Sequence, residues 1–152
     1  MKPIPRNQLS IMSIEILFHH SELVRACDTA RMLKALRLIA KDYEWEHAEI
    51  SVALVSDPEI HDVNKAHLQH DYPTDVISFD LTEQEDRLEG EIIASVETAD
   101  RDAPEHGWGG DDELLLYIVH GMLHIVGLRD KSTAEIQEMR AAERHYLSLF
   151  GL

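Results

Sequence analysis

The stretch DELLLYIVHGMLHIVG, residues 112–127, is the most apolar part of the chain, and the fold can be predicted outward from it. Its apolar side chains predict a helix over residues 112–126 that packs into the core of the protein. Gly127 is placed to end that helix, because glycine adopts the left-handed conformation of a helix C-terminus without a steric penalty. This helix carries two histidines, His120 and His124, towards the core.

Four short stretches around this helix predict β-strands, because apolar residues alternate with polar ones or form short runs in them. They are residues 13–18 (SIEILF), 49–55 (EISVALV), 74–79 (TDVISF) and 90–95 (GEIIAS). With about four to five helices that do not alternate strictly with the strands, they indicate α+β, as one domain with a four-stranded sheet over residues 1–152. Residues 1–12, with two prolines, are expected to form a loose leader.

Three further helices are expected from capping signals and from apolar residues spaced three and four apart. The first is capped by Ser21 and has an apolar face made up of Leu23, Ala26, Ala30, Leu33, Leu36 and Ala40. The second begins with Asp57 as its N-cap and Pro58 in the first helical position. The last begins with the capping box STAE, residues 132–135. Residues 100–110, with one proline and three glycines, are expected to be a connection.

The composition limits the classes of function. The chain has 152 residues, of which 14 are basic and 29 acidic, for a formal charge of −15. A protein that binds nucleic acid through its phosphates normally presents Lys and Arg, so an RNA site here must be a local basic patch. No apolar run approaches the roughly 20 residues of a membrane-spanning helix, so no membrane is expected. With one cysteine, Cys27, and no secretory signal, the chain is expected to be cytoplasmic.

The spacing of His120 and His124 predicts a metal site on the central helix. Residues four apart lie on one face of a helix, close enough for two imidazoles to hold one ion. If Gly127 turns the chain back, Asp130 can supply a carboxylate oxygen as third ligand. Two histidines and one carboxylate leave a fourth position for water, as in catalytic zinc sites. Such an ion lowers the pKa of bound water to about 7.

A structural alternative stays open, because an H-x-x-x-H pair by itself is more often two unrelated histidines. The apolar helix favours the metal site, since buried imidazoles need polar partners and a shared ion supplies one. Gly121 follows His120 at the position where helical zinc proteases carry the glutamate that acts as general base. A protease mechanism therefore lacks its base, and the glycine predicts the close approach of another backbone or of substrate.

Three blocks of the sequence occur in the order and spacing of a known family. Residues 120–130, HGMLHIVGLRD, are similar to H-G-x-L-H-L-x-G-Y-D-H. Asn64 and then residues 73–79, PTDVISF, are similar to an asparagine followed by P-T-D-V-L-S-F. Residues 90–94, GEIIA, match G-[DE]-I-x-I loosely. Over residues 13–150 the chain thus resembles the YbeY family of bacterial rRNA maturation factors, zinc-dependent endoribonucleases that cleave single strands.

The resemblance implies a fold, a cofactor and a substrate. The fold is α+β, with one zinc ion held by three ligands. The ligands fall on His120, His124 and Asp130, the last in place of a family histidine. A carboxylate still binds zinc but weakens the preference for it over harder ions. The implied role is processing of ribosomal RNA, notably the 3′ end of the small-subunit RNA, and ribosome quality control, with the small subunit and its RNA as partners.

The resemblance also places residues at the RNA cleft. Asn64 is implied to fix the helix that faces the cleft, whose edge is shaped by Thr74, Asp75 and Ser78. The family carries an arginine that contacts RNA four residues after the asparagine, and this chain has Leu68 there. Leucine cannot contact phosphate or stabilise the charge that develops on it. Arg129 or Lys131, beside the metal site in the sequence, is a candidate replacement.

Three hypotheses about function follow. The leading one is a metal-dependent endoribonuclease in rRNA maturation. A second is a ribosome-associated binding factor that has lost cleavage, which Leu68, Asp130 and the net acidity favour. A third is a metal-dependent hydrolase of small molecules or peptides, although Gly121 counts against peptides. Basic residues gathered around the metal cleft favour the first hypothesis, and scattered ones favour the others.

Overall fold

The computed structural model describes residues 12–68 and 74–152. The predicted leader, except for Met12, lies outside the described residues, as does the side chain of Leu68. None of the helices within the described ranges is both long and apolar enough to cross a lipid bilayer.

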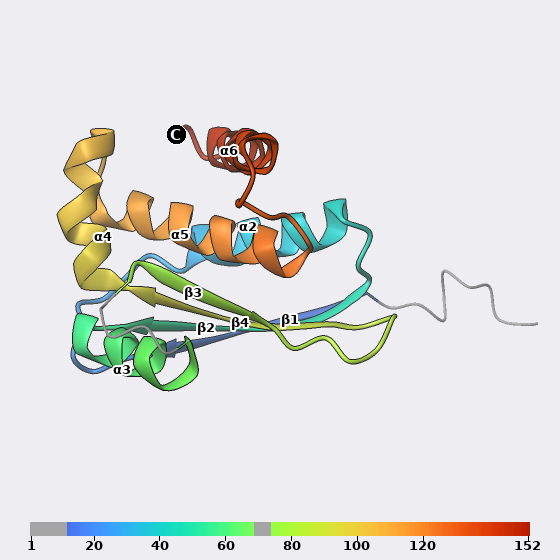
Figure 1. Ribbon diagram of the computed structural model, residues 1–152, viewed down its shortest axis with the longest axis horizontal. Coiled ribbons are helices and arrows are strands. Elements are labelled where there is room, and N and C mark those ends of the chain that lie inside the picture. Colours follow the sequence, from blue (N-terminus) through green and yellow to red (C-terminus); the bar gives the residue numbers. More distant parts are fainter. Residues whose placement is uncertain (1–11, 69–73) are drawn as a thin grey trace, which may run out of the picture.

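One mixed sheet forms the middle layer of the protein (Figure 1). Its strands are β1 (Ser13–His20), β2 (His47–Val55), β3 (Val76–Asp80) and β4 (Leu88–Ser95). They lie in the order β1-β2-β4-β3, with β1, β2 and β4 parallel and β3 antiparallel to β4. All four predicted strands are confirmed, although their ends are shifted by up to a few residues.

Helices cover both faces of the sheet (Figure 1). On one face lies α3 (Asp57–Leu68). On the other face lie α2, α4 and α5, and α6 packs on α5. Their bounds are α2 (Ala30–Asp42), α4 (Val96–Asp102), α5 (Gly110–Ile125) and α6 (Thr133–Ser148), with a 3-10 turn η1 (Ala103–His106) between α4 and α5. The four strands and five α-helices of the described residues confirm the α+β class.

Two hydrophobic cores hold these layers together. The main core lies between the sheet and helices α2, α5 and α6, and β2 contributes the buried side chains of Ala48, Ile50, Val52 and Leu54. The smaller core lies under α3, where Ile60 contacts the region of Ile77 and Ile93. Burial alternates along β2, because these four residues face the main core while Ala53 and Val55 are only partly buried against the smaller core.

Helix α5 lies very close to strand β4, and Gly121 is the reason. A Cβ atom added at Gly121 would lie 2.9 Å from Cγ2 of Ile92, which is fully buried on β4. The predicted close approach at this glycine is found, but the neighbour is the side chain of Ile92 and not a backbone or a substrate. The approach holds His120, the neighbouring residue, at a fixed height above the sheet.

The predicted cap of the first helix is wrong. Helix α2 begins at Ala30, and Thr29 precedes it without a side-chain cap, whereas Ser21 lies in an irregular segment. The Ser21 hydroxyl donates to Glu59 of α3 at 2.6 Å, and Arg25 forms ion pairs with Asp100 and Asp111. These tertiary contacts compete with local helix formation, and sequence periodicity does not reveal them.

Two further expectations need correction. The hydroxyl of Ser56 accepts the N–H of Glu59 and so takes the capping role predicted for Asp57. The Asp57 carboxylate instead accepts from Ser95, Thr98 and Arg101, tying α3 to α4. The predicted connection over 100–110 contains the end of α4 and the turn η1. Ser95 caps α4, and this helix is too short for its apolar residues to show a helical period. The capping box of α6 is confirmed.

We expect Gly121→Ala to lower the free energy of unfolding by up to about 2 kcal/mol. The added methyl overpacks the contact with Ile92, which costs about 1–3 kcal/mol, and the gain in helix propensity of about 1 kcal/mol offsets this only in part. Denaturant unfolding of a double-mutant cycle with Ile92→Ala measures the effect. The cost of Gly121→Ala should fall in the Ile92→Ala background, and an unchanged cost would contradict the steric explanation.

Candidate metal centre and cleft

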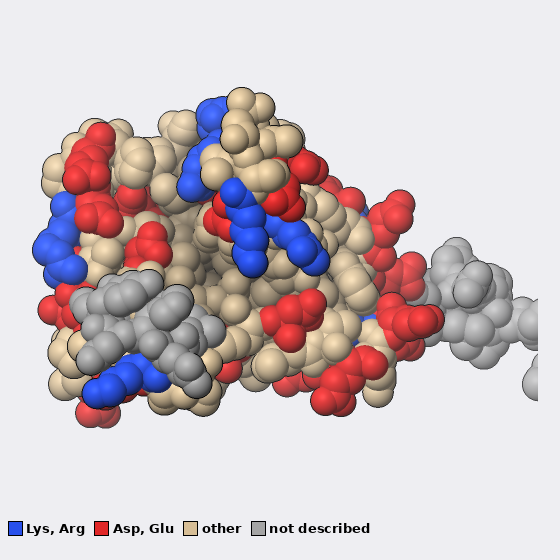
Figure 2. All heavy atoms as spheres, viewed as in Figure 1, with Lys and Arg blue, Asp and Glu red and all other residues tan. Residues whose placement is uncertain are grey.

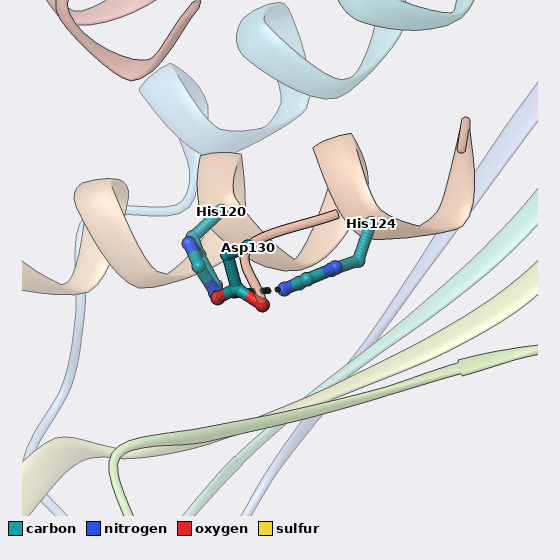
Figure 3. A group of neighbouring side chains, drawn as sticks. All are labelled: His120, His124 and Asp130. Carbon is teal, nitrogen blue, oxygen red and sulfur yellow. Dashed lines mark hydrogen bonds and ion pairs between the residues drawn. The ribbon is translucent and has the colours of Figure 1, made fainter. Parts of the chain in front are cut away.

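Helix α5 ends in a turn that brings Asp130 back to the two histidines. Gly127 has a φ of 114°, which glycine adopts without strain. Its N–H donates to the carbonyl of His124 at 3.0 Å, and the following N–H donates to the carbonyl of Leu123 at 2.9 Å, which is a Schellman motif. The chain reverses directly after the helix, and Asp130 points towards His120 and His124 (Figure 3).

Three electron-rich atoms meet at one point. Nε2 of His120 and Nε2 of His124 are 3.0 Å apart, and Oδ2 of Asp130 lies 3.6 Å from the first and 3.4 Å from the second. For a tetrahedral ion with ligands at about 2.0–2.1 Å, ligand atoms lie about 3.3–3.4 Å apart. All three side chains are partly buried, and they are the one such group within residues 12–68 and 74–152. The donor set therefore fits a divalent cation.

The outer nitrogens of the two imidazoles fix which atoms face that point. Nδ1 of His124 lies 3.0 Å from the carbonyl oxygen of Leu128, which can only accept a hydrogen bond. Nδ1 of His120 lies 3.4 Å from Oε2 of Glu143. With a proton on each Nδ1, both Nε2 atoms are available as ligands on the side of Asp130, which is how metal-binding histidines are oriented.

Glu143 is a buried carboxylate on α6, with an exposed fraction of 3%. Burial raises the pKa of its carboxyl, but the hydrogen bonds from His120 and Arg140 outweigh that effect, and the pKa lies below its ordinary value. Glu143 is thus ionised at neutral pH and accepts from Arg140 and from Nδ1 of His120. An ionised partner increases the basicity of the ligand, which favours cation binding at Nε2.

A cleft of about 690 Å³ opens beside His120 and Asp130. Its walls come from the end of α4, from η1, α5 and α6, and from the chain entering β3, where Asp75 lines it. The hydroxyl of Tyr117 donates to Asp102 at 3.0 Å across one wall, and burial together with that carboxylate raises the pKa of Tyr117. We call His120, His124 and Asp130 the metal group. A smaller cavity of about 260 Å³ lies next to His124 of this group.

The charges around the cleft are mixed. Among the described basic residues, Arg140 and Arg144 of α6 line it, and Figure 2 shows basic side chains at α6 hanging over the hollow. Six acidic residues line it too: Asp75, Asp102, Glu105, Glu113, Asp130 and Glu143. Other arginines form ion pairs elsewhere: Arg25, Arg31, Arg87 and Arg101. The expected basic patch therefore consists of two arginines in acidic surroundings.

Comparison with known proteins identifies the family. The family model described as endoribonuclease YbeY matches residues 18–151, which include the whole metal group and the cleft walls. The chain belongs to the YbeY family.

Relatives of this YbeY-family chain, each named endoribonuclease YbeY, come from several bacteria. The protein of Rhodopirellula baltica is 44% identical over 109 residues, which is 70% of this chain and 56% of that protein. Those of Bacteroides thetaiotaomicron and Chloroherpeton thalassium are 40% and 38% identical, and the matches cover 75% and 78% of this chain and 82% and 83% of theirs. The chain thus spans a little over half the length of the first relative and most of the other two.

The fold is similar to that of a Thermotoga maritima protein whose structure was solved in solution. The two chains superpose with a TM-score of 0.61 over 90% of this chain and 91% of the other, at 23% sequence identity. At this identity the likeness concerns the fold alone.

The structure brings several of the predicted YbeY-type residues to the metal group. Asp75 lines the larger cleft, and the Thr74 hydroxyl donates to its carboxylate at 3.4 Å. Ser78 lines the smaller cavity together with His124. Asn64 is buried on α3, on the opposite face of the sheet from α5. Arg129 is exposed and is not among the described residues that line either cavity. The roles of all these residues stay predictions.

Several cleft residues were missed from the sequence, among them Arg140, Glu143 and Arg144 of α6. Their spacing of three and four puts them on one face of α6, a signal that the sequence contains. That face becomes part of the cleft because α6 packs across α5, and the spacing cannot say which helix it meets.

We expect the purified YbeY-family chain to bind about one equivalent of divalent metal after dialysis against zinc. His124→Ala and Asp130→Ala each remove one of the three converging atoms and should abolish stoichiometric binding. Elemental analysis measures the metal content, and circular dichroism checks that each variant is folded. Glu105→Ala, on the cleft wall away from the metal group, is the matched control and should keep its metal. Wild-type protein without metal would contradict the predicted site.

We expect Glu143→Gln to weaken zinc affinity by about 10- to 100-fold without removing the site. The amide has nearly the same shape as the carboxylate, but it lacks the charge that polarises the imidazole of His120. Competition with a chelator of known affinity measures the change. Glu138→Gln, an exposed residue on the same helix, is the control. Equal affinities for both variants and the wild type would show that Glu143 does not act on the metal.

Proposed function

We propose that this chain is a metal-dependent endoribonuclease that cleaves single-stranded RNA in the cleft beside His120. The observation that carries the proposal is the convergence of Nε2 of His120, Nε2 of His124 and Oδ2 of Asp130 at the edge of that cleft. Membership of the YbeY family and the names of its relatives support RNA as the substrate.

The finer role follows from the resemblance. We propose zinc as the ion, and ribosomal RNA as the substrate, notably the 3′ end of the small-subunit RNA. The chain would act with the small ribosomal subunit in the cytoplasm, as a single domain, and take part in ribosome quality control. The family motif at residues 120–130 supports this role, although Asp130 stands where the family has a histidine.

The residues of the chain divide the chemical work. A divalent ion held here would make a bound water more acidic and would polarise the phosphodiester. His120, His124 and Asp130 would hold it, and Glu143 and the carbonyl of Leu128 keep the two imidazoles in the required tautomer. The ionised Glu143 also fixes Arg140.

Arg144 is the cation that we assign to the RNA phosphate. It is exposed, lines the cleft with His120 and forms no ion pair with any residue in the described part of the chain. A guanidinium can donate two parallel hydrogen bonds to a phosphate, which both orients it and stabilises its developing charge. Arg144 thus takes the role that Leu68 cannot fill, and its position in the cleft favours it over Arg129.

The acidic cleft favours a second candidate, a ribosome-associated binding factor without cleavage. Six carboxylate residues around two arginines weaken phosphate binding, and Asp130 replaces a family ligand. Such a factor would bind RNA and leave it intact. A hydrolase of small molecules would neither bind nor cleave RNA, so the same assay separates all three hypotheses.

We expect the zinc-loaded protein to cleave single-stranded RNA, and His124→Ala to abolish the cleavage. Arg144→Ala should lower kcat/KM by about 10- to 100-fold, the value of a hydrogen bond to a charged group. Arg129→Ala, the variant of the other candidate arginine, should have a smaller effect. Single-turnover cleavage of a labelled oligoribonucleotide measures all of these. A larger loss in Arg129→Ala would return the phosphate contact to that residue, and binding without cleavage would favour the binding factor.

A further inference from the structure

A second buried carboxylate faces the cleft, and it does not contact the metal group. Glu113 in the first turn of α5 has an exposed fraction of 1%. Its Oε1 lies 2.7 Å from Nδ1 of His106, and its Oε2 accepts the indole N–H of Trp108 at 3.2 Å. One carboxylate therefore holds two aromatic rings in place, and both rings line the cleft that contains His120.

The two rings lie against each other in the cleft wall, and His106 is the more exposed of the two. Their centroids are 5.1 Å apart and their planes are inclined by 37°. The side chain of His106 is 49% exposed, and Trp108 is partly buried against the main core. A contact that served only to brace the turn before α5 would not require two aromatic faces on the wall of a cleft. Fixed aromatic faces of this kind are what stacking of a nucleobase needs, because they lose little freedom when a base binds.

The position of these rings suits a strand whose phosphate lies at the metal group. Glu113, which holds them, and His120 are on the same helix and seven residues apart, which corresponds to about 10 Å along α5. Stacked bases follow one another at about 3.4 Å. A base against the rings that Glu113 holds would therefore lie a few nucleotides from the scissile phosphate.

The charge of the cleft makes base contacts necessary. Phosphate contacts supply most of the affinity of ordinary nucleic-acid-binding proteins. Here Arg140 is already held by the buried Glu143, Arg144 is the other cation of the described cleft wall, and six acidic residues oppose them. Stacking on an aromatic face does not depend on the phosphate charge, so it can supply the affinity that this cleft loses to repulsion.

We propose that His106 and Trp108 form a base-stacking shelf that receives one nucleobase of the single-stranded RNA substrate. The shelf deepens the proposed endoribonuclease function and rests on it. Because every base has an aromatic face, the shelf tolerates different sequences, and it favours single strands, whose bases are free to leave their neighbours.

The first test uses the fluorescence of Trp108. The chain has two tryptophans, Trp45 and Trp108, so the variant Trp45→Phe reports on the shelf alone. Trp45 packs against the main core and is not among the described residues that line the cleft. Stopped-flow mixing with a short oligoribonucleotide should quench the remaining fluorescence before cleavage proceeds. An oligonucleotide with the same number of phosphates but without bases should not quench it.

The second test measures affinity with the anisotropy of labelled RNA. Trp108→Ala should weaken binding by about 5- to 150-fold, the range for one stacked base. Trp108→Phe keeps an aromatic face and should retain most of the affinity. In the wild type, the slope of log K against log salt should be no steeper than about −1.4, since at most two arginines of the described cleft wall can contact phosphates, at about −0.7 for each contact.

The outcomes separate the shelf from the function on which it rests. The shelf would be supported if RNA quenches Trp108 and the oligonucleotide without bases does not. Trp108→Ala should also lose RNA affinity, and Trp108→Phe should retain most of it. If the wild type binds and cleaves RNA while Trp108→Ala does so equally well and Trp108 is not quenched, the shelf is wrong and the endoribonuclease stands. A Trp108→Ala protein that loses stability but keeps its RNA affinity also overturns the shelf. If the wild type does not bind RNA, both proposals fail.

Discussion

Helix α5 lies directly on strand β4 because Gly121 presents no side chain to Ile92, and the rest of the site depends on this contact. The approach sets the height of His120 above the sheet, and the helical repeat then places His124 beside it. The turn at Gly127 returns Asp130 to the same point. If α5 lay further from the sheet, all of these ligand atoms would lie further from the start of β3, which lines the cleft.

Two buried carboxylates line the cleft, and each holds a different set of side chains in place. Glu143 comes from α6 and acts on the metal group through His120, while Glu113 comes from α5 and holds the rings of His106 and Trp108. Each is buried at a few per cent exposure or less and each has donors for its oxygens, as buried charges require. In the proposed complex the phosphate lies near Glu143 and the metal group, and one base stacks on the rings that Glu113 holds. This division would allow a chain of charge −15 to act on the proposed polyanionic substrate.

Local patterns predicted most of the fold. The four strands, the buried helix α5 and the capping box of α6 follow from periodicity and from residues within one turn. The errors occurred where a polar side chain has a distant partner. Ser21 bonds to Glu59 instead of capping a helix, and Asp57 bonds to residues of α4. The residue types that cap helices also form hydrogen bonds to distant residues, so a sequence cannot distinguish the two uses.

The sequence by itself determined the convergence of His120, His124 and Asp130, because these residues and Gly127 lie in one short stretch and local backbone geometry relates them. Only the tertiary structure decided what surrounds that group. Arg140, Glu143 and Arg144 belong to the cleft because α6 packs across α5, and their sequence spacing is the same whichever surface they face. Apolar faces pack together whatever their separation in the chain. The packing of α6 on α5 therefore decides which charged residues line the cleft.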